Sequence, residues 1–199
     1  MILPVVAYGD PVLKKVCEEI EEDYKDLNLL IDNMFETMYD ASGVGLAAPQ
    51  IGKAIRLFIV DASTFAEVEE GDELDPLAEG CEGFKRVFIN PIIEEETGEE
   101  WAFAEGCLSI PKIREDVYRK PNVRMSYFDE NWEFKEEVFT GYAARVIQHE
   151  YDHVEGVLFT DHLTPLKKRI LKKKLVNISK GDIDIHYRMK FPAQKGRKR

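Results

Sequence analysis

The chain has 199 residues, of which 44% are hydrophobic and 33% charged, as in a soluble globular protein long enough for one domain with a sizeable core. The net charge of the chain is −11. Residues 166–199 carry thirteen Lys and Arg against two Asp, a net charge of +11, so the first 165 residues carry a net charge of −22. Any contact with a polyanion is therefore expected through the basic C-terminal segment. The cytoplasm is the expected location. The three cysteines contain no C-x-x-C pair, the start is not a convincing signal peptide, and no run is long enough to span a membrane.

The first elements predicted along the chain are helices without chemical groups of interest. Asp10 and Pro11 read as an N-cap and a first-turn proline, which predicts a short helix to about Glu19. A second helix is predicted over residues 24–39, because apolar side chains recur there at helical spacing. Both helices are expected to serve packing only.

Residues 43–52 form a small, apolar, glycine-rich stretch. Its glycines would let another backbone approach closely, but it lacks the G-K-[ST] of a phosphate-binding loop. Gln50 could offer a neutral amide donor to a carbonyl oxygen. Taken alone, the stretch is more often an ordinary turn.

The next region alternates predicted strands with an acidic segment. A strand is predicted over residues 55–61, followed at residues 64–83 by eight acidic residues and no basic one, which we interpret as a solvated surface loop. A second strand is predicted over residues 87–94, where Pro91 favours an edge position or a bulge. Residues 101–104 are expected to be its return strand.

The C-terminal half contains a hairpin and two helices. Residues 123–129 and 133–139 alternate around a turn and predict the hairpin. A helix from about Thr140 to Gly156 is apolar nearly all round in its first half, so it should be buried centrally. With strands clustered before and between the helices, the sequence predicts an α+β fold: antiparallel sheets packed around this central helix, with a C-terminal helix.

The central helix carries the motif H-E-x-x-H at residues 149–153. Because a helix turns about 100° per residue, His149 and His153 lie on adjacent turns of one face and can hold one metal ion from the same side. Glu150 would stay free to act as general base on a water at that metal. The alternative is two histidines meeting by chance on a buried helix, but two of the only four histidines lie here beside a Glu.

A catalytic metal site of this type needs a third protein ligand and an open position. Downstream, Glu155 faces elsewhere on the helix, and His162 lacks the spacing of known zinc proteases. Upstream, Cys107 could supply a thiolate, which suits ferrous iron, zinc, cobalt or nickel. Considered alone, Cys107 would more often be a buried structural cysteine.

Three stretches together resemble the peptide deformylase family closely. They match G-x-G-L-A-A-P-Q at residues 43–50, E-G-C-L-S at 105–109 and Q-H-E-x-D-H-L-x-G at 148–156, in the same order and at similar separations. The one departure is Val154, where the family usually has Leu, and it keeps an apolar side chain. The motifs are highly specific jointly, and the resemblance covers roughly residues 1–178.

The resemblance implies a metal-dependent hydrolase that removes the formyl group from the N-terminal methionine of nascent bacterial polypeptides and releases formate. By the family pattern, Cys107, His149 and His153 bind one divalent metal ion, Fe²⁺ in the cell and often Zn²⁺, Ni²⁺ or Co²⁺ after purification. Glu150 is implied as general base and acid: it takes a proton from the attacking water and returns it to the leaving amine.

The family pattern also implies how the substrate is held. Gln50 and the backbone amide of Leu108 are the expected catalytic donors to the formyl oxygen as its carbon becomes tetrahedral. A formyl group carries only hydrogen where acetyl has a methyl, so a tight site could select it sterically. The residues expected to bind the substrate are Val44, Gly45, Glu105, Arg114, Tyr142 and Val146.

Within that set, Val44 and Gly45 are expected to pair with the substrate backbone like an added strand. Tyr142 and Val146 are candidates for the apolar pocket that takes the methionine side chain. Arg145 lies in the same wall, where its stem could pack while its charged head reaches solvent.

We expect residues 1–199 to form a single catalytic domain, with an acidic surface loop at 64–83, a basic helix at 165–178 and a C-terminal tail at 182–199 whose alternation predicts a strand. The basic helix resembles the form that docks on ribosomal RNA near the nascent-chain exit, and a merely solvated basic face is an equal alternative. The expected partner is the formyl-methionyl nascent peptide, and neither a membrane nor DNA is expected.

Two other functions compete with this interpretation. A general metallopeptidase would explain the H-E-x-x-H motif, but not Cys107 within E-G-C-L-S. A non-catalytic, metal-stabilised binding module would need a fourth protein ligand, such as His162, to close the site.

Overall fold

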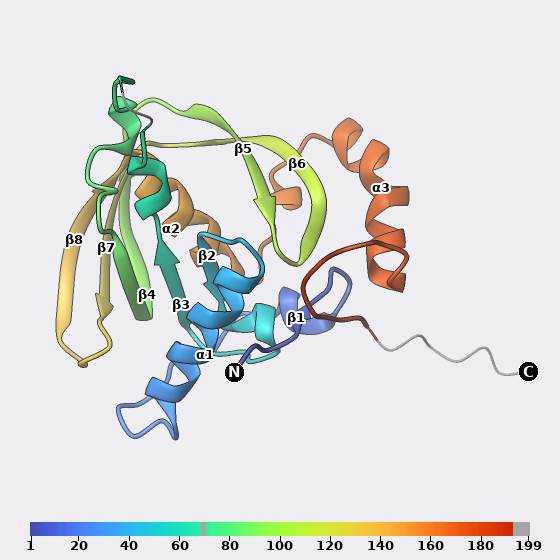
Figure 1. Cartoon of the computed structure of the whole chain (residues 1–199), viewed down its shortest axis with the longest axis horizontal. Helices are drawn as coiled ribbons and strands as arrows, with labels where there is room; N and C mark the ends of the chain where they lie inside the picture. Colours follow the sequence, from blue (N-terminus) through green and yellow to red (C-terminus); the bar gives the residue numbers. More distant parts are fainter. Residues whose placement is uncertain (69–70, 193–199) are drawn as a thin grey trace, which may run out of the picture.

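The structure, a computed structural model, describes residues 1–68 and 71–192 of the chain (Figure 1). Its helices and strands are β1 (Val5–Val6), α1 (Leu27–Asp40), β2 (Gly45–Ala47), β3 (Leu57–Asp61), β4 (Lys85–Thr97), β5 (Trp101–Cys107), β6 (Ile110–Arg119), β7 (Asn122–Phe128), β8 (Phe134–Thr140), α2 (Gly141–Val154), α3 (Pro165–Lys180) and β9 (Met189–Lys190). Short 3-10 turns lie at Pro11–Lys14, Ala48–Ile51, Ser63–Ala66, Pro76–Ala78 and Phe159–Asp161.

The largest sheet is antiparallel, with the strand order β2-β3-β4-β7-β8. Its β3 and its β7–β8 hairpin confirm the strands predicted over residues 55–61 and 123–139. The register of β4 shifts between Ile89 and Ile92, so the bulge predicted at Pro91 is confirmed. Pro91 also lies past the end of the β3 ladder, which stops at Ile89, so among the described strands β4 has a partner on the β7 side alone at this point, and the Pro91 carbonyl accepts a hydrogen bond from the Arg56 side chain.

The prediction of residues 101–104 as the return strand of β4 is wrong. The second half of β4 pairs with β7, as in Thr97 opposite Asn122. β5 does not pair with the opposite edge of β4. β5 pairs instead with β6 in a separate two-stranded sheet, which arches over α2 towards α3 (Figure 1). The alternation of side chains within a segment predicts a strand, but it does not determine which distant strand will pair with it.

Helix α2 lies between the five-stranded sheet and the β5–β6 hairpin, as its apolar first half predicted. Ala144 and Ile147 are fully buried in the cluster formed with the five-stranded sheet. The helix starts at Gly141, whose φ is +56°, after the β-region residue Thr140. An added Cβ at Gly141 would lie 2.1 Å from the Leu77 carbonyl oxygen, so this start requires glycine. The α+β fold class is confirmed.

The first predicted helix is mostly wrong. Only Pro11–Lys14 form a 3-10 turn, with Asp10 accepting from the Val12 N–H as the predicted cap. Beyond it, the Cys17 N–H donates to the Val154 carbonyl at 2.8 Å and the chain continues extended, so tertiary hydrogen bonds replace the helix. The second predicted helix is present as α1.

The acidic segment is only partly the solvated loop that was predicted. The acidic side chains that the structure describes in it are exposed, but Ala78 and Cys81 are fully buried. The 3-10 turn Ser63–Ala66 places Phe65 against Tyr142 of α2, with ring centroids 4.9 Å apart. The segment therefore packs on the central helix.

The C-terminal region begins as predicted with Thr164 accepting from the Lys167 N–H, and α3 ends at Gly181 with a φ of +77°. The strand predicted in the tail is reduced to β9, which pairs parallel with β1. Residues 193–199 lie outside the described part of the chain. No helix among the described residues is long and apolar enough to cross a membrane.

Candidate active site

The predicted metal ligands come together in the structure. Cys107 at the end of β5 meets His149 and His153 of α2, and one ligand atom from each lies within 4.8 Å of the other two. The Cys107 Sγ lies 3.3 Å from the His153 Nε2. One sulfur and two imidazole nitrogens are a donor set that suits a divalent transition-metal ion.

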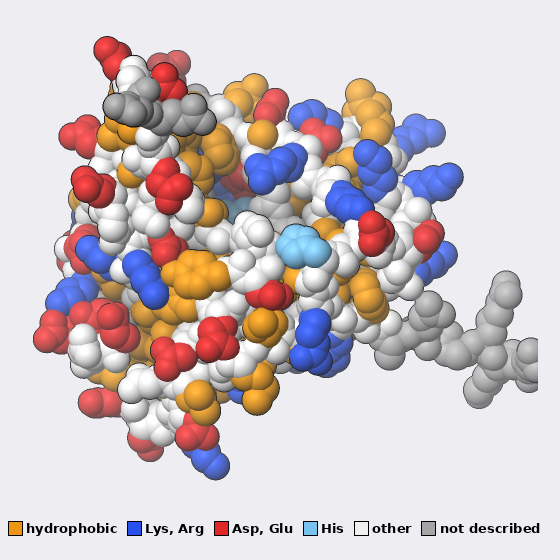
Figure 2. Space-filling view, viewed as in Figure 1, with side chains coloured by type: hydrophobic (Ala, Val, Ile, Leu, Met, Phe, Trp, Pro, Cys, Tyr) orange, Lys and Arg blue, Asp and Glu red, His pale blue; other side chains and the backbone are white. Residues whose placement is uncertain are grey.

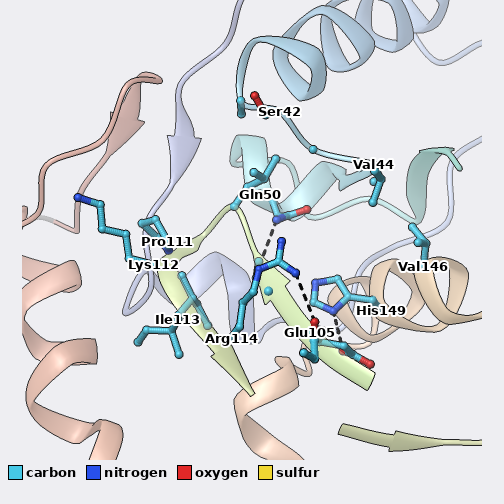
Figure 3. A pocket seen from close by; sticks show the side chains of 18 of the residues that line it. Ser42, Val44, Gln50, Glu105, Pro111, Lys112, Ile113, Arg114, Val146 and His149 are labelled. Atoms are coloured by element: carbon cyan, nitrogen blue, oxygen red, sulfur yellow. Dashed lines mark hydrogen bonds and ion pairs between the residues drawn. The ribbon is translucent and has the colours of Figure 1, made fainter. Parts of the chain in front are cut away.

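Glu105 fixes the orientation of His149. Its Oε2 lies 2.9 Å from the His149 Nδ1, the contact dashed in Figure 3, so the Nε2 of that ring is free for a metal. Its carboxylate also accepts from Arg119 at 2.7 and 3.0 Å and from Arg145 at 3.1 Å. Glu105 borders the cavity as expected of a substrate-binding residue, but these protein contacts occupy its buried carboxylate.

The expectation that the Arg145 head reaches solvent is wrong. Its side chain is 2% exposed and donates to Glu105, to the Val117 carbonyl at 3.1 Å and to the Trp101 carbonyl at 2.8 Å. A buried guanidinium is tolerated here because a carboxylate and two carbonyl oxygens replace its hydration.

The charges of the site favour a thiolate and a carboxyl group that titrates near neutrality. Burial opposes ionisation of the Cys107 thiol, but His153 and hydrogen bonds from both histidines outweigh it and lower the Cys107 pKa to about 5. Burial raises the Glu150 pKa to about 7, against the charges of His149 and His153. The pKa of Glu105 stays well below its usual range, because bonds from His149 and Arg119 outweigh burial.

Glu150 faces the cavity beside Gly45. A Cβ added to Gly45 would lie 2.4 Å from the Glu150 Oε1, so only glycine leaves room for the carboxylate at this point. The Glu150 Oε2 is buried without a hydrogen-bond partner among the described residues. A buried oxygen without a partner, next to three atoms that could hold a metal ion, fits a site that takes an ion or water.

Gln50 is held with its amide group turned into the site. Its Oε1 accepts from the Ala47 N–H at 2.8 Å, which leaves the Nε2 to donate towards Cys107 Sγ and Ser109 Oγ, each at 3.4 Å. Ser109 is fully buried, and sequence reasoning gave it no role although it belongs to the E-G-C-L-S motif. The amide donor predicted at Gln50 therefore points at the Cys107 sulfur.

A cavity of about 950 Å³ opens beside these groups. Figure 2 shows this face of the molecule hollowed near its centre, with hydrophobic and basic side chains at the rim. Of the residues expected to act on or bind the substrate, those that line the cavity are Val44, Gly45, Gln50, Glu105, Leu108, Arg114, Val146 and Glu150. In Figure 3, Arg114 and Val146 border it from different elements, the β5–β6 hairpin and α2.

Tyr142 does not line the cavity. Its ring packs on Phe65 and Phe103, which do, and its hydroxyl donates to Asp75 at 2.6 Å. Tyr142 thus supports the apolar wall from behind. Phe65 belongs to the acidic segment, whose composition gave no sign of a part in the site.

Two further groups were missed by sequence reasoning. Arg119 joins Glu105 to Asp152 at 2.8 Å and so ties β6 to α2. Residues 184–187 of the C-terminal tail line the cavity, and only the alternation of the tail could have suggested that they pack inwards. His162 pairs with Asp152 at 2.7 Å and does not join the group of metal-binding atoms, so the fourth ligand of a closed site is not found among the described residues.

Comparison with known proteins gives one consistent result. Residues 2–169 match the model of the family described as polypeptide deformylase. A peptide deformylase from Christiangramia forsetii is 59% identical over 195 residues, which cover 98% of each chain. The crystal structure of a peptide deformylase from Legionella pneumophila is 34% identical, with a TM-score of 0.74 over 92% of this chain and 98% of that one. An Arabidopsis thaliana peptide deformylase 1B, solved in complex with an inhibitor, is 32% identical, with a TM-score of 0.76 over 90% of this chain and 92% of that one.

Proposed function

The chain belongs to the peptide deformylase family, metal-dependent hydrolases that remove the N-terminal formyl group of nascent peptides, and from this premise we propose which of its residues carry the reaction. Cys107, His149 and His153 hold the metal ion, and Glu150 moves the proton. The observation that carries this assignment is the meeting of one sulfur and two imidazoles beside a buried carboxylate with an unpaired oxygen.

The bound metal is proposed to be Fe²⁺ in the cell, with Zn²⁺, Ni²⁺ or Co²⁺ as alternatives after purification. A thiolate beside two neutral imidazoles accepts any of these ions. When bound, the ion supplies Lewis acidity toward water and the formyl oxygen. Metal analysis of protein purified without oxygen tests the identity, and a predominance of zinc under those conditions would contradict iron.

Glu150 is proposed as the proton carrier. Burial raises the pKa of the Glu150 carboxyl above its ordinary value, which favours a group that takes a proton from the attacking water and gives it to the leaving amine. The missing side chain of Gly45 keeps the Glu150 carboxylate free to face the cavity. The unpaired Oε2 is available to receive the proton.

The formyl oxygen is proposed to accept hydrogen bonds from the Gln50 Nε2 and the Leu108 N–H. The support is the fixed orientation of Gln50 and the place of Leu108 directly after Cys107 at the cavity wall. The substrate backbone would lie along Val44 and Gly45, with Val146 beside the methionine side chain.

Tyr142 is proposed to support that methionine pocket through Phe65 and Phe103. Arg114 borders the same cavity and is proposed to contact the substrate chain. Glu105 is proposed to act on the substrate only through His149, because protein donors already occupy its carboxylate.

The test is formate release from a formyl-methionyl peptide by metal-loaded protein prepared without oxygen. Glu150→Gln keeps the size of the side chain and should lower kcat by about 10²–10⁴-fold, the usual contribution of general acid–base catalysis, while the metal is retained. An acetyl-methionyl peptide serves as the steric control and should not be hydrolysed. Unchanged turnover by a metal-loaded Glu150→Gln variant would refute the role of Glu150.

A ribosome contact through the basic helix α3 is proposed as well. The helix exposes most of its Lys and Arg, together with Leu166 and Ile170, which are 68% and 66% exposed. Reversing the charge of Lys172 and Lys173 to Glu should abolish co-sedimentation with ribosomes at low salt while formate release is unchanged. If co-sedimentation persists, the helix is a solvated basic face.

Residues 1–199 are proposed to act as one catalytic domain in the cytoplasm, on the nascent peptide and on neither DNA nor a membrane. The site draws on β2, the β5–β6 hairpin, α2 and the tail, which supports a single unit. The three free cysteines support a reducing compartment. A single calorimetric transition and fractionation of cells test these points, and two separate transitions would contradict the single unit.

A further inference from the structure

The C-terminal tail returns from α3 to the active-site cavity. Its described part, residues 182–192, follows Gly181 and ends beside β1, to which β9 is paired. Ile183, Met189 and Phe191 pack on the core cluster that also holds residues of β6 and α3, whereas residues 184–187 line the cavity. The tail follows the residues that match the family model, so that match assigns it no role.

One hydrogen bond connects the tail directly to the turn that carries the metal ligand. The half-buried Tyr187 donates its hydroxyl to the Leu108 carbonyl oxygen at 2.7 Å. Leu108 follows Cys107, and its side chain reaches towards Gly43 on the opposite side of the cleft. The next residue, Ser109, is held by the Tyr8 N–H, which donates to its carbonyl at 2.9 Å.

This turn lacks the backbone conformation of the favoured hairpin turns. Leu108 and Ser109 alone connect β5 to β6, and the favoured two-residue hairpin turns need a positive φ at one or both positions. Neither residue has a positive φ, and the strand register shifts between Gly106 and Cys107. The pair of Cys107 with Ile110 closes the turn, and hydrogen bonds from outside the hairpin help to fix its conformation.

We propose that Tyr187 is a positioning residue of the active site, whose hydrogen bond to the Leu108 carbonyl keeps the Leu108 N–H directed at the formyl oxygen. The Leu108 N–H and carbonyl lie in the two peptide planes that meet at its Cα, and in a two-residue turn with both ends paired an anchor on the carbonyl restricts the dihedral changes that would redirect the N–H. Preorganised donors stabilise a transition state only while they keep their direction. The inference rests on the proposed function, because the Leu108 N–H as donor is part of that proposal.

The first test is the pair of variants Tyr187→Phe and Tyr118→Phe in the full-length, metal-loaded protein. Tyr118 is the matched control, because its ring is 66% exposed and its hydroxyl has no partner among the described residues. Loss of one such donor costs about 10²–10³-fold in kcat, so a donor that is present but misdirected should cost about tenfold. We expect Tyr187→Phe to lower kcat about tenfold, with the KM for a formyl-methionyl peptide, the metal content and the melting temperature unchanged.

The second test needs no substrate. Amide hydrogen exchange in a peptide fragment that covers residues 107–110 should be faster in Tyr187→Phe than in wild type or Tyr118→Phe, with the exchange of α2 unaltered. If kcat and this exchange stay at wild-type values, the inference is refuted. A raised KM at unchanged kcat also refutes it, because Tyr187 would then bind substrate rather than position the turn.

The two proposals can fail separately. If metal-loaded wild type releases no formate, the proposed residue roles fail, whereas the exchange measurement still decides whether Tyr187 holds the turn. If wild type is active and Tyr187→Phe matches it in both measurements, only the inference about Tyr187 fails.

Discussion

Replacing Glu105 by Gln tests whether this carboxylate holds the metal centre together. The change keeps the volume but removes the carboxylate that pairs with Arg145 and with the His149 Nδ1, and it leaves Arg119 with Asp152 as its carboxylate partner within the described residues. Breaking one partner of a buried ion pair costs roughly 3–5 kcal/mol. Because Arg119 keeps Asp152 at 2.8 Å and the amide oxygen of Gln can still accept, we expect the lower end, about 3 kcal/mol.

The matched control is Glu115→Gln, on the residue paired with Glu105 across the β5–β6 hairpin. Glu115 pairs with Lys167 at 2.8 Å, but their side chains are 24% and 40% exposed, so about 0–1 kcal/mol is expected. Urea unfolding of the metal-free variants measures both values. Competition with a chelator should show metal affinity about 10–100-fold weaker in Glu105→Gln alone. A stability loss below about 1 kcal/mol together with unchanged affinity would refute this role of Glu105.

Three further predictions concern steric and acid–base features of the site and core. Gly45→Ala should lower kcat by about 10²-fold with little loss of stability, because the added Cβ would lie 2.4 Å from the Glu150 Oε1 and would displace the carboxylate. Turnover near wild type would contradict this. Gly141→Ala should destabilise the fold by about 2–5 kcal/mol in urea unfolding, because φ is +56° and the Cβ meets backbone of Leu77 at 2.1 Å. Burial raises the Cys17 pKa to about 11, so Cys17 in the native protein should resist iodoacetamide at pH 8. The stability that the neutral thiol contributes is complete below its ordinary pKa of 9.0 and should be lost as the pH rises towards 11. A Cys17→Ala variant should lose less stability over that pH range.

The chemical residues could be predicted from the sequence because their spacing encodes local geometry. His149 and His153 share a helical face at any location in a fold, and Cys107 followed from a motif whose residues lie next to each other in the chain. The prediction that α2 is central also depended on local information, since apolar residues all round a helix can be satisfied only by burial on every side.

The errors arose where a distant partner decides the outcome. Local alternation indicated a strand at residues 101–104, but it could not indicate that this strand would pair with β6 rather than with β4. Arg145 was predicted to reach solvent because its partner Glu105 lies forty residues earlier, in another sheet. The packing of Phe65 on Tyr142 could not be predicted from a segment whose composition is acidic and polar.

These long-range contacts explain how the site keeps its shape. The hairpin that carries Cys107 and the helix that carries the two histidines share no backbone hydrogen bonds, since β5 pairs only with β6. Arg119 bridges them by binding Glu105 on the hairpin and Asp152 on the helix. Side-chain charge therefore sets the distance between the thiolate and the imidazoles before any metal arrives, and binding energy is not spent on assembling the ligands. The same argument extends to Tyr187, whose hydrogen bond to the Leu108 carbonyl ties the turn of the hairpin to the C-terminal tail, next to the exposed ion pair between Lys112 and Asp184.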